Sequence, residues 1–205
     1  MPNGPPRTLF KLGGSLLDVP DLAERLRRLA ALRSEHRIAF LPGGGATADL
    51  VRDWSDRFAL SDHAAHWLAI DAMGLNAQLL RELIPGSTLV TEMPALRLAE
   101  ADERPVVLVA GPLLRQIAEA GGPSLSESWE VTSDAIAACL AAALGFDELV
   151  LVKSCEPAAD TLETLAERGQ VDPAFPEVAG TLGAVGWVNL RSQELRVRAV
   201  RGRGP

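Results

Sequence analysis

Lysine is almost absent from this sequence. Of the 20 basic residues in the 205-residue chain, only Lys11 and Lys153 are lysines, and the other 18 are arginines. Lysine carries a compact, flexible ammonium group that a planar guanidinium cannot replace. A chain with this preference for arginine keeps lysine mainly where the ammonium is needed, so we expect Lys11 and Lys153 to be functional residues.

An excess of positive charge is also missing, since the formal net charge is −7 and the pI is about 5.0. Nucleic-acid binding needs a basic face that neutralises phosphates, so no nucleic-acid partner is expected. The arginine-rich stretch 191–203 is the one local exception. We interpret it as a strand with solvent-facing arginines followed by a frayed end.

Long hydrophobic runs, a signal peptide and a cysteine framework are missing as well. No segment reaches the ~18 uninterrupted apolar residues of a membrane helix, and Met1 to Pro6 contain no apolar signal core. The two cysteines, Cys139 and Cys155, have neither metal-ligand spacing nor the density of a disulfide scaffold. We therefore expect a cytoplasmic protein with reduced thiols and no membrane partner.

Short apolar runs alternate with longer amphipathic stretches along the chain, which is the pattern of βα units. The expected fold class is α/β, with an open, mainly parallel sheet flanked by helices on both faces in three layers. With 47% hydrophobic residues, 1–205 can form a single domain with one core. Strands are expected at 8–11, 37–41, 87–90, 106–110, 149–152, 185–189 and 195–200, and helices at 21–33, 46–58, 62–84, 93–99, 112–120, 133–144 and 161–167.

Two glycine-rich turns follow the first two expected strands. They read Lys11-Leu12-Gly13-Gly14-Ser15 and Pro42-Gly43-Gly44-Gly45-Ala46. Paired glycines let backbone amides approach an anion, and a helix N-terminus adds a favourable dipole. The second turn also fits the dinucleotide fingerprint G-x-G-x-x-A, but residues 61–65 begin a helix where that motif expects an acidic strand end. A nicotinamide-dependent enzyme is therefore a weaker alternative, and phosphate binding is expected to be shared by the two turns.

Polar side chains follow two further strand ends. Lys153 comes directly after the apolar run 149–152, so both lysines are expected at the same edge of a parallel sheet, with phosphates between them. Thr132, Ser133 and Asp134 lead into the helix 133–144, where they either cap the helix or orient a nucleotide. The long loops 121–131 and 154–183 are expected to be lids or ligand walls.

The helix expected at 62–84 contains Gly74, which needs a reason because mid-helix glycine costs about 1 kcal/mol relative to alanine. Close helix packing is one explanation, and contact of Asp71 and Asn76 with an acceptor is the other. His63 and His66 lie three residues apart, but no third ligand matches their spacing, so no metal site is expected.

These motifs resemble the amino acid kinase superfamily, which includes acetylglutamate, aspartate and uridylate kinases. The resemblance rests on K-x-G-G-S at 11–15, P-G-G-G at 42–45, D-A-M-G-L-N at 71–76 and V-T-S-D at 131–134, which keep the family order over nearly the whole chain. It implies an ATP-dependent kinase with Mg²⁺ bound through ATP, a small-molecule acceptor and a homo-oligomeric assembly.

The same resemblance assigns roles to individual residues. Lys11 would stabilise the transferring phosphoryl group and Asp134 would organise the catalytic charges. Residues implied in nucleotide or phosphate binding are Gly13, Gly14, Ser15, Lys153, Thr132, Ser133, Asp172 and Phe175. Residues implied in acceptor binding are Gly43, Gly44, Gly45, Asp71 and Asn76.

Within this superfamily the chain is most similar to the short kinases of methanofuran biosynthesis, through the segments 66–73, 128–134 and 171–176. That similarity implies an aminomethylfuran methanol phosphate as acceptor, phosphorylated to a diphosphate for a cofactor of one-carbon metabolism. The sequence departs from the family after Lys153, where Ser154-Cys155-Glu156-Pro157 replaces the usual T-x-V-D-G-V-Y loop. A non-catalytic nucleotide- or oxyanion-binding protein, or a kinase for a carboxylate or a nucleoside monophosphate, are therefore alternatives.

Overall fold

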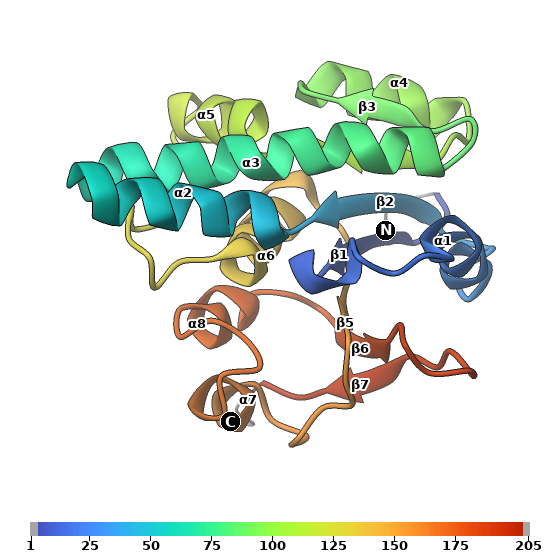
Figure 1. The fold of residues 1–205 in the computed structure, drawn as a ribbon. Coiled ribbons are helices and arrows are strands. Elements are labelled where there is room, and N and C mark those ends of the chain that lie inside the picture. The colour runs from blue at the N-terminus through green and yellow to red at the C-terminus, as the bar shows by residue number, and fades with distance from the viewer. Residues whose placement is uncertain (1–3, 203–205) are drawn as a thin grey trace.

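The computed structural model describes residues 4–202 and contains one seven-stranded sheet. Its strand order is β3-β4-β2-β1-β5-β6-β7, and every pair is parallel except β6 with β7. The expected mainly parallel sheet is confirmed (Figure 1). The strands are β1 (Arg7–Leu12), β2 (Arg37–Pro42), β3 (Thr88–Val90), β4 (Val106–Leu108), β5 (Glu148–Lys153), β6 (Val185–Asn189) and β7 (Arg198–Val200).

Helices cover both faces of this sheet, as a three-layer α/β fold requires. The long helix α3 lies beside α2, and α6 packs against the central strands β1 and β5 (Figure 1). The helices are α1 (Leu22–Ala31), α2 (Gly45–Phe58), α3 (Asp62–Leu83), α4 (Met93–Ala101), α5 (Ala110–Glu119), α6 (Ser133–Leu144), α7 (Leu162–Glu167) and α8 (Phe175–Ala179), with a 3-10 turn η1 at Gly14–Leu16.

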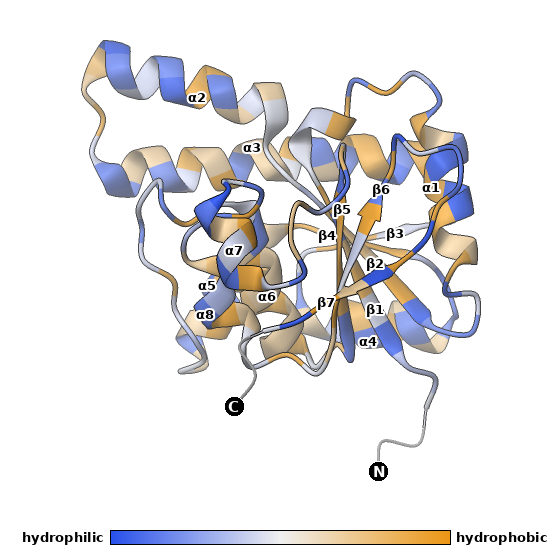
Figure 2. Ribbon diagram, turned by 90° about the horizontal axis from the view of Figure 1, so that it is seen from below, coloured by the Kyte–Doolittle hydropathy of each residue, from blue (hydrophilic) through white to orange (hydrophobic). Residues whose placement is uncertain are grey.

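Side chains that alternate along each strand divide the core into two layers. On β1, Leu9 belongs to the cluster formed with α4, α5, α6, α7 and α8, whereas Phe10 belongs to the cluster under α1. The helix α3 joins both clusters, since Met73 packs in the first and Leu80 in the second. The strands in the middle of the molecule are strongly hydrophobic, and hydrophilic residues lie on the outer helices (Figure 2).

A few element boundaries differ from the expectation. The strand expected at 106–110 ends at Leu108, and α5 begins at Ala110 because Pro112 is tolerated in the first turn of a helix. The last strand covers only Arg198–Val200. Neither η1 nor α8 was expected, since segments of three and five residues are too short to show a helical period.

Residues 1–3 and 203–205 lie outside the described part of the chain. The predictions for Met1 to Pro6 and for the C-terminal end therefore fall partly on residues that are not described. Among residues 4–202, no helix has the length and apolar character needed to cross a bilayer.

Candidate functional site

The two lysines meet at the carboxyl edge of the sheet. The strands β1 and β5 are adjacent and parallel, and Lys11, near the carboxyl end of β1, pairs with Leu151, two residues before Lys153 at the end of β5. Both ammonium groups contact Asp134 at the start of α6, with Lys11 Nζ 2.7 Å from Oδ1 and Lys153 Nζ 2.7 Å from Oδ2. Lys11 and Asp134 are only 2% and 3% exposed. One carboxylate thus holds both lysines of the chain in fixed positions.

Burial and charge together set the ionisation of this Lys11–Asp134–Lys153 triad. Burial is the largest influence on Lys11 and lowers its pKa from 10.5 to about 8, although Asp134 opposes the shift. Burial alone would raise the pKa of Asp134, but the two ammonium groups outweigh it and lower that pKa from 3.8 to about 2. At neutral pH the triad therefore carries two positive charges and one negative charge, an arrangement suited to an anion.

The two glycine turns touch each other beside the triad. A Cβ on Gly14 would come within 2.1 Å of the Gly45 backbone nitrogen, and one on Gly43 within 2.9 Å of the Gly14 nitrogen. Gly45 also has a φ of +53°, which only glycine adopts easily. A side chain at any of these three positions would push the turns apart, so their glycines are explained by close backbone approach.

Asn76 supports the second turn from α3. Its Nδ2 donates to the carbonyl oxygens of Gly43 and Gly44, at 2.8 Å each, and its Oδ1 accepts from Thr47 Oγ1 at 3.2 Å. The side chain is buried. This position gives Asn76 a role in holding the glycine turn, and its contact with an acceptor stays a prediction.

Asp172 caps the helix that carries Asp134. Its Oδ2 accepts hydrogen bonds from Thr132 N (3.1 Å), Thr132 Oγ1 (2.8 Å) and Ala135 N (2.9 Å), while its buried Oδ1 has no protein partner. A carboxylate at a helix N-terminus satisfies free amides and interacts favourably with the dipole. Burial raises the pKa of Asp172. The expected side-chain cap from Thr132, Ser133 or Asp134 is not formed, because Asp172 from a distant loop fills that role.

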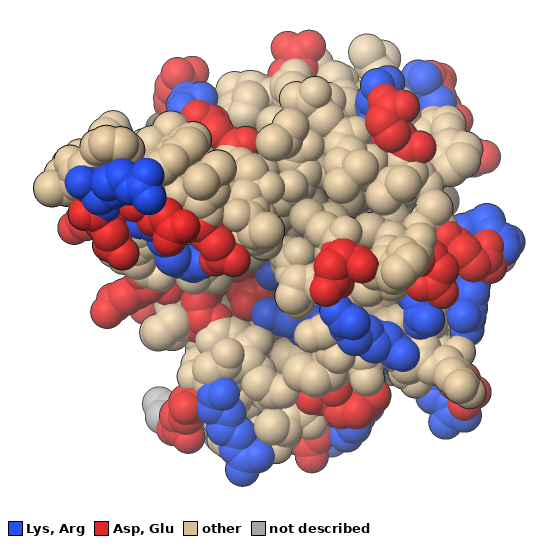
Figure 3. All heavy atoms as spheres, in the orientation of Figure 1, with Lys and Arg blue, Asp and Glu red and all other residues tan. Residues whose placement is uncertain are grey.

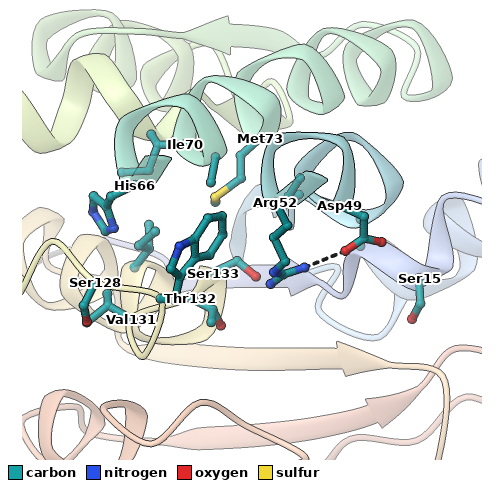
Figure 4. A pocket seen from close by; sticks show the side chains of 17 residues that line it. Ser15, Asp49, Arg52, His66, Ile70, Met73, Ser128, Val131, Thr132 and Ser133 are labelled. Carbon is teal, nitrogen blue, oxygen red and sulfur yellow. Dashed lines mark hydrogen bonds and ion pairs between the residues drawn. The ribbon is translucent and has the colours of Figure 1, made fainter. Parts of the chain in front are cut away.

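A pocket of about 220 Å³ opens next to the glycine turns (Figure 4). Its walls come from the turn after β1, from α2 and α3, and from the loop 121–131 with the start of α6. Ser128, Trp129 and Val131 of this loop line the pocket, and the loop's role as a ligand wall stays a prediction. The remaining lining residues are Gly14, Ser15, Gly44, Gly45, Ala48, Asp49, Arg52, His66, Ala69, Ile70, Met73, Thr132, Ser133 and Ile136.

The other long loop, 154–183, is fastened beside Lys153. Gln170 O accepts from Lys153 Nζ at 2.9 Å, and Gln170 Nε2 donates to Glu156 O at 3.0 Å. Trp187 Nε1 also donates to Cys155 O at 2.8 Å. Hydrogen bonds thus hold the segment that departs from the family pattern next to Lys153.

Most residues singled out in the sequence lie together around the triad and the pocket. Those that do are Lys11, Gly13, Gly14, Ser15, Gly43, Gly44, Gly45, Thr132, Ser133, Asp134 and Lys153, with Asp172 behind them. Their roles in binding and catalysis stay predictions.

Two residues singled out in the sequence lie elsewhere. Phe175 is fully buried in the hydrophobic core, where it packs, and its implied nucleotide contact stays a prediction. Asp71 is exposed and lines a separate depression with Arg115 and Thr91. The structure does not bring Asp71 to the pocket, and its contact with an acceptor stays a prediction.

Sequence reasoning missed Arg52 and Asp49, which line the pocket from α2. The spacing of these residues was a signal that could have found them. Residues three or four apart on a helix lie on the same face, so Asp49 and Arg52 follow the glycine turn at the start of α2 on one face of that helix. Gly74 has no packing explanation, since a Cβ there would only reach ordinary contact with Val109, at 3.6 Å.

The sequence is similar to those of known proteins. The family model described as "Amino acid kinase family" matches residues 6–156. The chain is 28% identical over 145 residues to the [5-(aminomethyl)furan-3-yl]methyl phosphate kinase of Methanocaldococcus jannaschii, a match that covers 70% of this chain and 63% of that relative's length.

Three solved structures share the fold. They are UMP kinase from Ureaplasma parvum (13% identity, 93% of this chain and 92% of that one, TM-score 0.63), uridylate kinase from Archaeoglobus fulgidus (18%, 88% and 89%, 0.62) and aspartate kinase from Synechocystis (15%, 96% and 40%, 0.65). At these identities the likeness shows the three-layer α/β architecture.

Proposed function

Because the chain belongs to the amino acid kinase family, we propose that it transfers the γ-phosphoryl group of ATP to a small acceptor. The observation that carries the proposal is the Lys11–Asp134–Lys153 triad at the sheet edge, next to two glycine turns and an open pocket. Phosphoryl transfer asks a protein for positioning and for positive charge where negative charge develops, and this arrangement offers both.

In the proposed reaction, an oxygen of the acceptor attacks the γ-phosphorus of ATP in line with the leaving group. A new O–P bond forms, the bond between the γ-phosphorus and the β–γ bridging oxygen breaks, and ADP leaves with that bond's electron pair. The Lys11 ammonium and the backbone amides of Gly14 and Gly45 would stabilise the charge on the transferring group.

Magnesium would enter with ATP. Among residues 4–202 no group of three His, Cys, Asp or Glu side chains is placed to hold a metal by itself, so the donors would come mainly from the phosphates. Bound Mg²⁺ would supply positive charge to the phosphate oxygens.

The acceptor that we propose is the phosphate of an aminomethylfuran methanol phosphate, in the biosynthesis of a methanofuran-type cofactor. The name of the Methanocaldococcus jannaschii relative supports it. The pocket supports it too, because Ala69, Ile70 and Met73 offer an apolar wall to a small ring while the glycine turns lie at its polar side.

The test is to incubate the purified chain with ATP, Mg²⁺ and a panel of acceptors comprising the aminomethylfuran phosphate, UMP, aspartate and acetylglutamate. We expect ADP release and a new diphosphate signal in ³¹P NMR with the furan phosphate alone. Turnover of UMP or of a carboxylate instead would contradict the proposed acceptor but would still support kinase activity.

A non-catalytic binder is the second candidate, motivated by the fastened loop beside Lys153. Thermal stabilisation by ATP without ADP release from any acceptor would favour this candidate over a kinase. Stabilisation by NAD would instead reopen the nicotinamide alternative.

We also propose that residues 1–205 act as one domain and assemble into a homo-oligomer through α2 and α3. Apolar side chains on these helices are exposed, and the surface over α3 is largely free of charged residues (Figure 3). Light scattering should give the mass of a dimer or larger assembly, and Leu75→Glu should reduce it to that of a monomer. The exposed apolar residues are Leu50, Trp54, Phe58, Leu68, Leu75 and Leu79.

A further inference from the structure

The pocket contains a single permanently charged cation. Of the 17 side chains that line it, Arg52 is the only lysine or arginine and Asp49 the only carboxylate. His66 also lines the pocket, but burial lowers its pKa and so disfavours the charged form of its ring. The triad lysines are not among the residues that line the pocket. An anion that enters the pocket therefore meets Arg52.

Arg52 is held in place from two sides. Its guanidinium carbon lies 5.1 Å from the centre of the Trp129 ring, and Nη1 donates to Asp49 Oδ1 at 2.5 Å. Trp129 in turn packs against Ala48 and Val51 of α2. In Figure 4 the guanidinium of Arg52 points towards Asp49, with Ser133 on its other side. Stacking on an aromatic ring fixes the plane of a guanidinium and leaves its other donors free.

The bond to Asp49 is weak enough to be exchanged. The Arg52 and Asp49 side chains are 51% and 68% exposed, and an ion pair between exposed side chains contributes little to stability. A phosphate accepts two parallel hydrogen bonds from one guanidinium and carries more charge than a carboxylate. An incoming phosphate would therefore displace Asp49 at small cost.

We propose that Arg52 is the specificity-determining residue that recognises the anionic group of the acceptor, and that Asp49 holds its guanidinium until the acceptor arrives. This inference rests on the proposed function, since it names the residue that selects a phosphorylated acceptor at that site. The ligand class is a small phosphate monoester whose phosphate lies between Arg52 and the Gly44–Gly45 turn, which also lines the pocket.

The experiment compares Arg52→Met and Arg52→Lys with Arg57→Met, a control on the exposed end of the same helix that does not line the pocket. Arg52→Met should raise the KM for the phosphate monoester about 10- to 100-fold, the range of a lost charged hydrogen-bonding pair, while the KM for ATP stays within about twofold. Arg52→Lys keeps the charge but loses the two parallel donors of the guanidinium, so its KM should lie between those of wild type and Arg52→Met. Arg57→Met should equal wild type.

A binding measurement separates this inference from the proposed reaction. Thermal stabilisation by the furan methanol phosphate should exceed that by its unphosphorylated alcohol in wild type, and the difference should vanish in Arg52→Met. This result supports the inference even if no acceptor is phosphorylated. Equal KM and equal stabilisation in Arg52→Met and wild type would overturn it, as would equal binding of phosphate and alcohol by wild type.

Asp49→Asn tests the exchange itself. This variant should bind the phosphate monoester at least as tightly as wild type, because the competing carboxylate is gone. A loss of binding as large as in Arg52→Met would show that Asp49 orients the acceptor directly, and would overturn the proposed displacement.

Discussion

Asp134→Asn should destabilise the protein and abolish phosphoryl transfer, for one electrostatic reason. The carboxylate lies 2.7 Å from both Lys11 Nζ and Lys153 Nζ and is buried, so its removal leaves two ammonium groups facing each other without a counter-charge. Breaking a buried ion pair in this way costs about 3–5 kcal/mol. In a domain of this size that lowers the melting temperature by roughly 6–20 °C.

The pH dependence of this loss identifies its cause. Lys11 has a pKa lowered to about 8, so the folded wild type releases that proton above pH 8, whereas the unfolded chain holds it to about pH 10.5. In the Asp134→Asn variant no carboxylate stabilises the buried Lys11 ammonium, so Lys11 should lose its proton at a lower pH than in wild type. The difference in melting temperature between wild type and Asp134→Asn should therefore be larger near pH 7 than near pH 9.5.

Differential scanning calorimetry at both pH values, together with ADP release at pH 7, is the assay. The triple variant Lys11→Met, Asp134→Leu and Lys153→Met serves as control, because apolar residues of similar volume can replace a buried ionic triad at little cost in stability. It should regain part of the lost melting temperature but no activity. If Asp134→Asn melts within about 2 °C of wild type, or the difference does not change with pH, the charge argument is refuted.

Further predictions concern the same site. Lys11→Met should lower kcat by roughly 10²-fold or more. Its melting temperature should fall less than that of Asp134→Asn, because Asp134 keeps Lys153 as counter-charge. Normal turnover in steady-state kinetics would contradict the role of Lys11. Wild-type kcat/KM should fall above pH about 8 as Lys11 loses its proton, and Lys11→Arg, which stays protonated, should lack that decline in a pH profile. Gly45→Ala should lower stability and raise the KM for ATP, because its φ is +53° and the new Cβ would lie 2.6 Å from Gly14 O; an unchanged KM would argue against a phosphate-binding turn. Asp172→Ala should cost about 1–3 kcal/mol in urea unfolding, since Thr132 and Ala135 lose their acceptor.

Much of the fold follows from local pattern. Apolar runs of strand length and amphipathic helices in alternation lead to a parallel sheet, because only crossover connections join parallel strands. Local pattern does not reveal η1 and α8, whose three and five residues hold no full period, nor the early start of α5, which the pattern predicts at Pro112. At these three places local propensity is weak, and tertiary packing decides whether a helix forms and where it begins.

The sequence predicted those parts of the site that depend on lysine and glycine, because the positions of these residues in the chain are informative. Two lysines among 20 basic residues, each near the end of an apolar run, and two glycine clusters at helix starts pointed to one sheet edge. The capping of α6 by Asp172 was not foreseeable, because the chain between them folds into β5 and α7 before it returns. Phe175 belongs to the same returning segment, and the family resemblance implies a ligand contact for its aromatic ring where the structure has a core residue.

The sequence by itself determined which chemical groups stand at the ends of the strands, since strand ends, glycine turns and helix starts are local features of the chain. Only the tertiary structure decided which of those groups meet. Asp134 lies between the two lysines because β1 and β5 are neighbours and α6 starts above them, and Arg52 lies on Trp129 because a loop crosses to α2. Strand order and loop path depend on how apolar surfaces far apart in the chain are buried together, which no local pattern specifies.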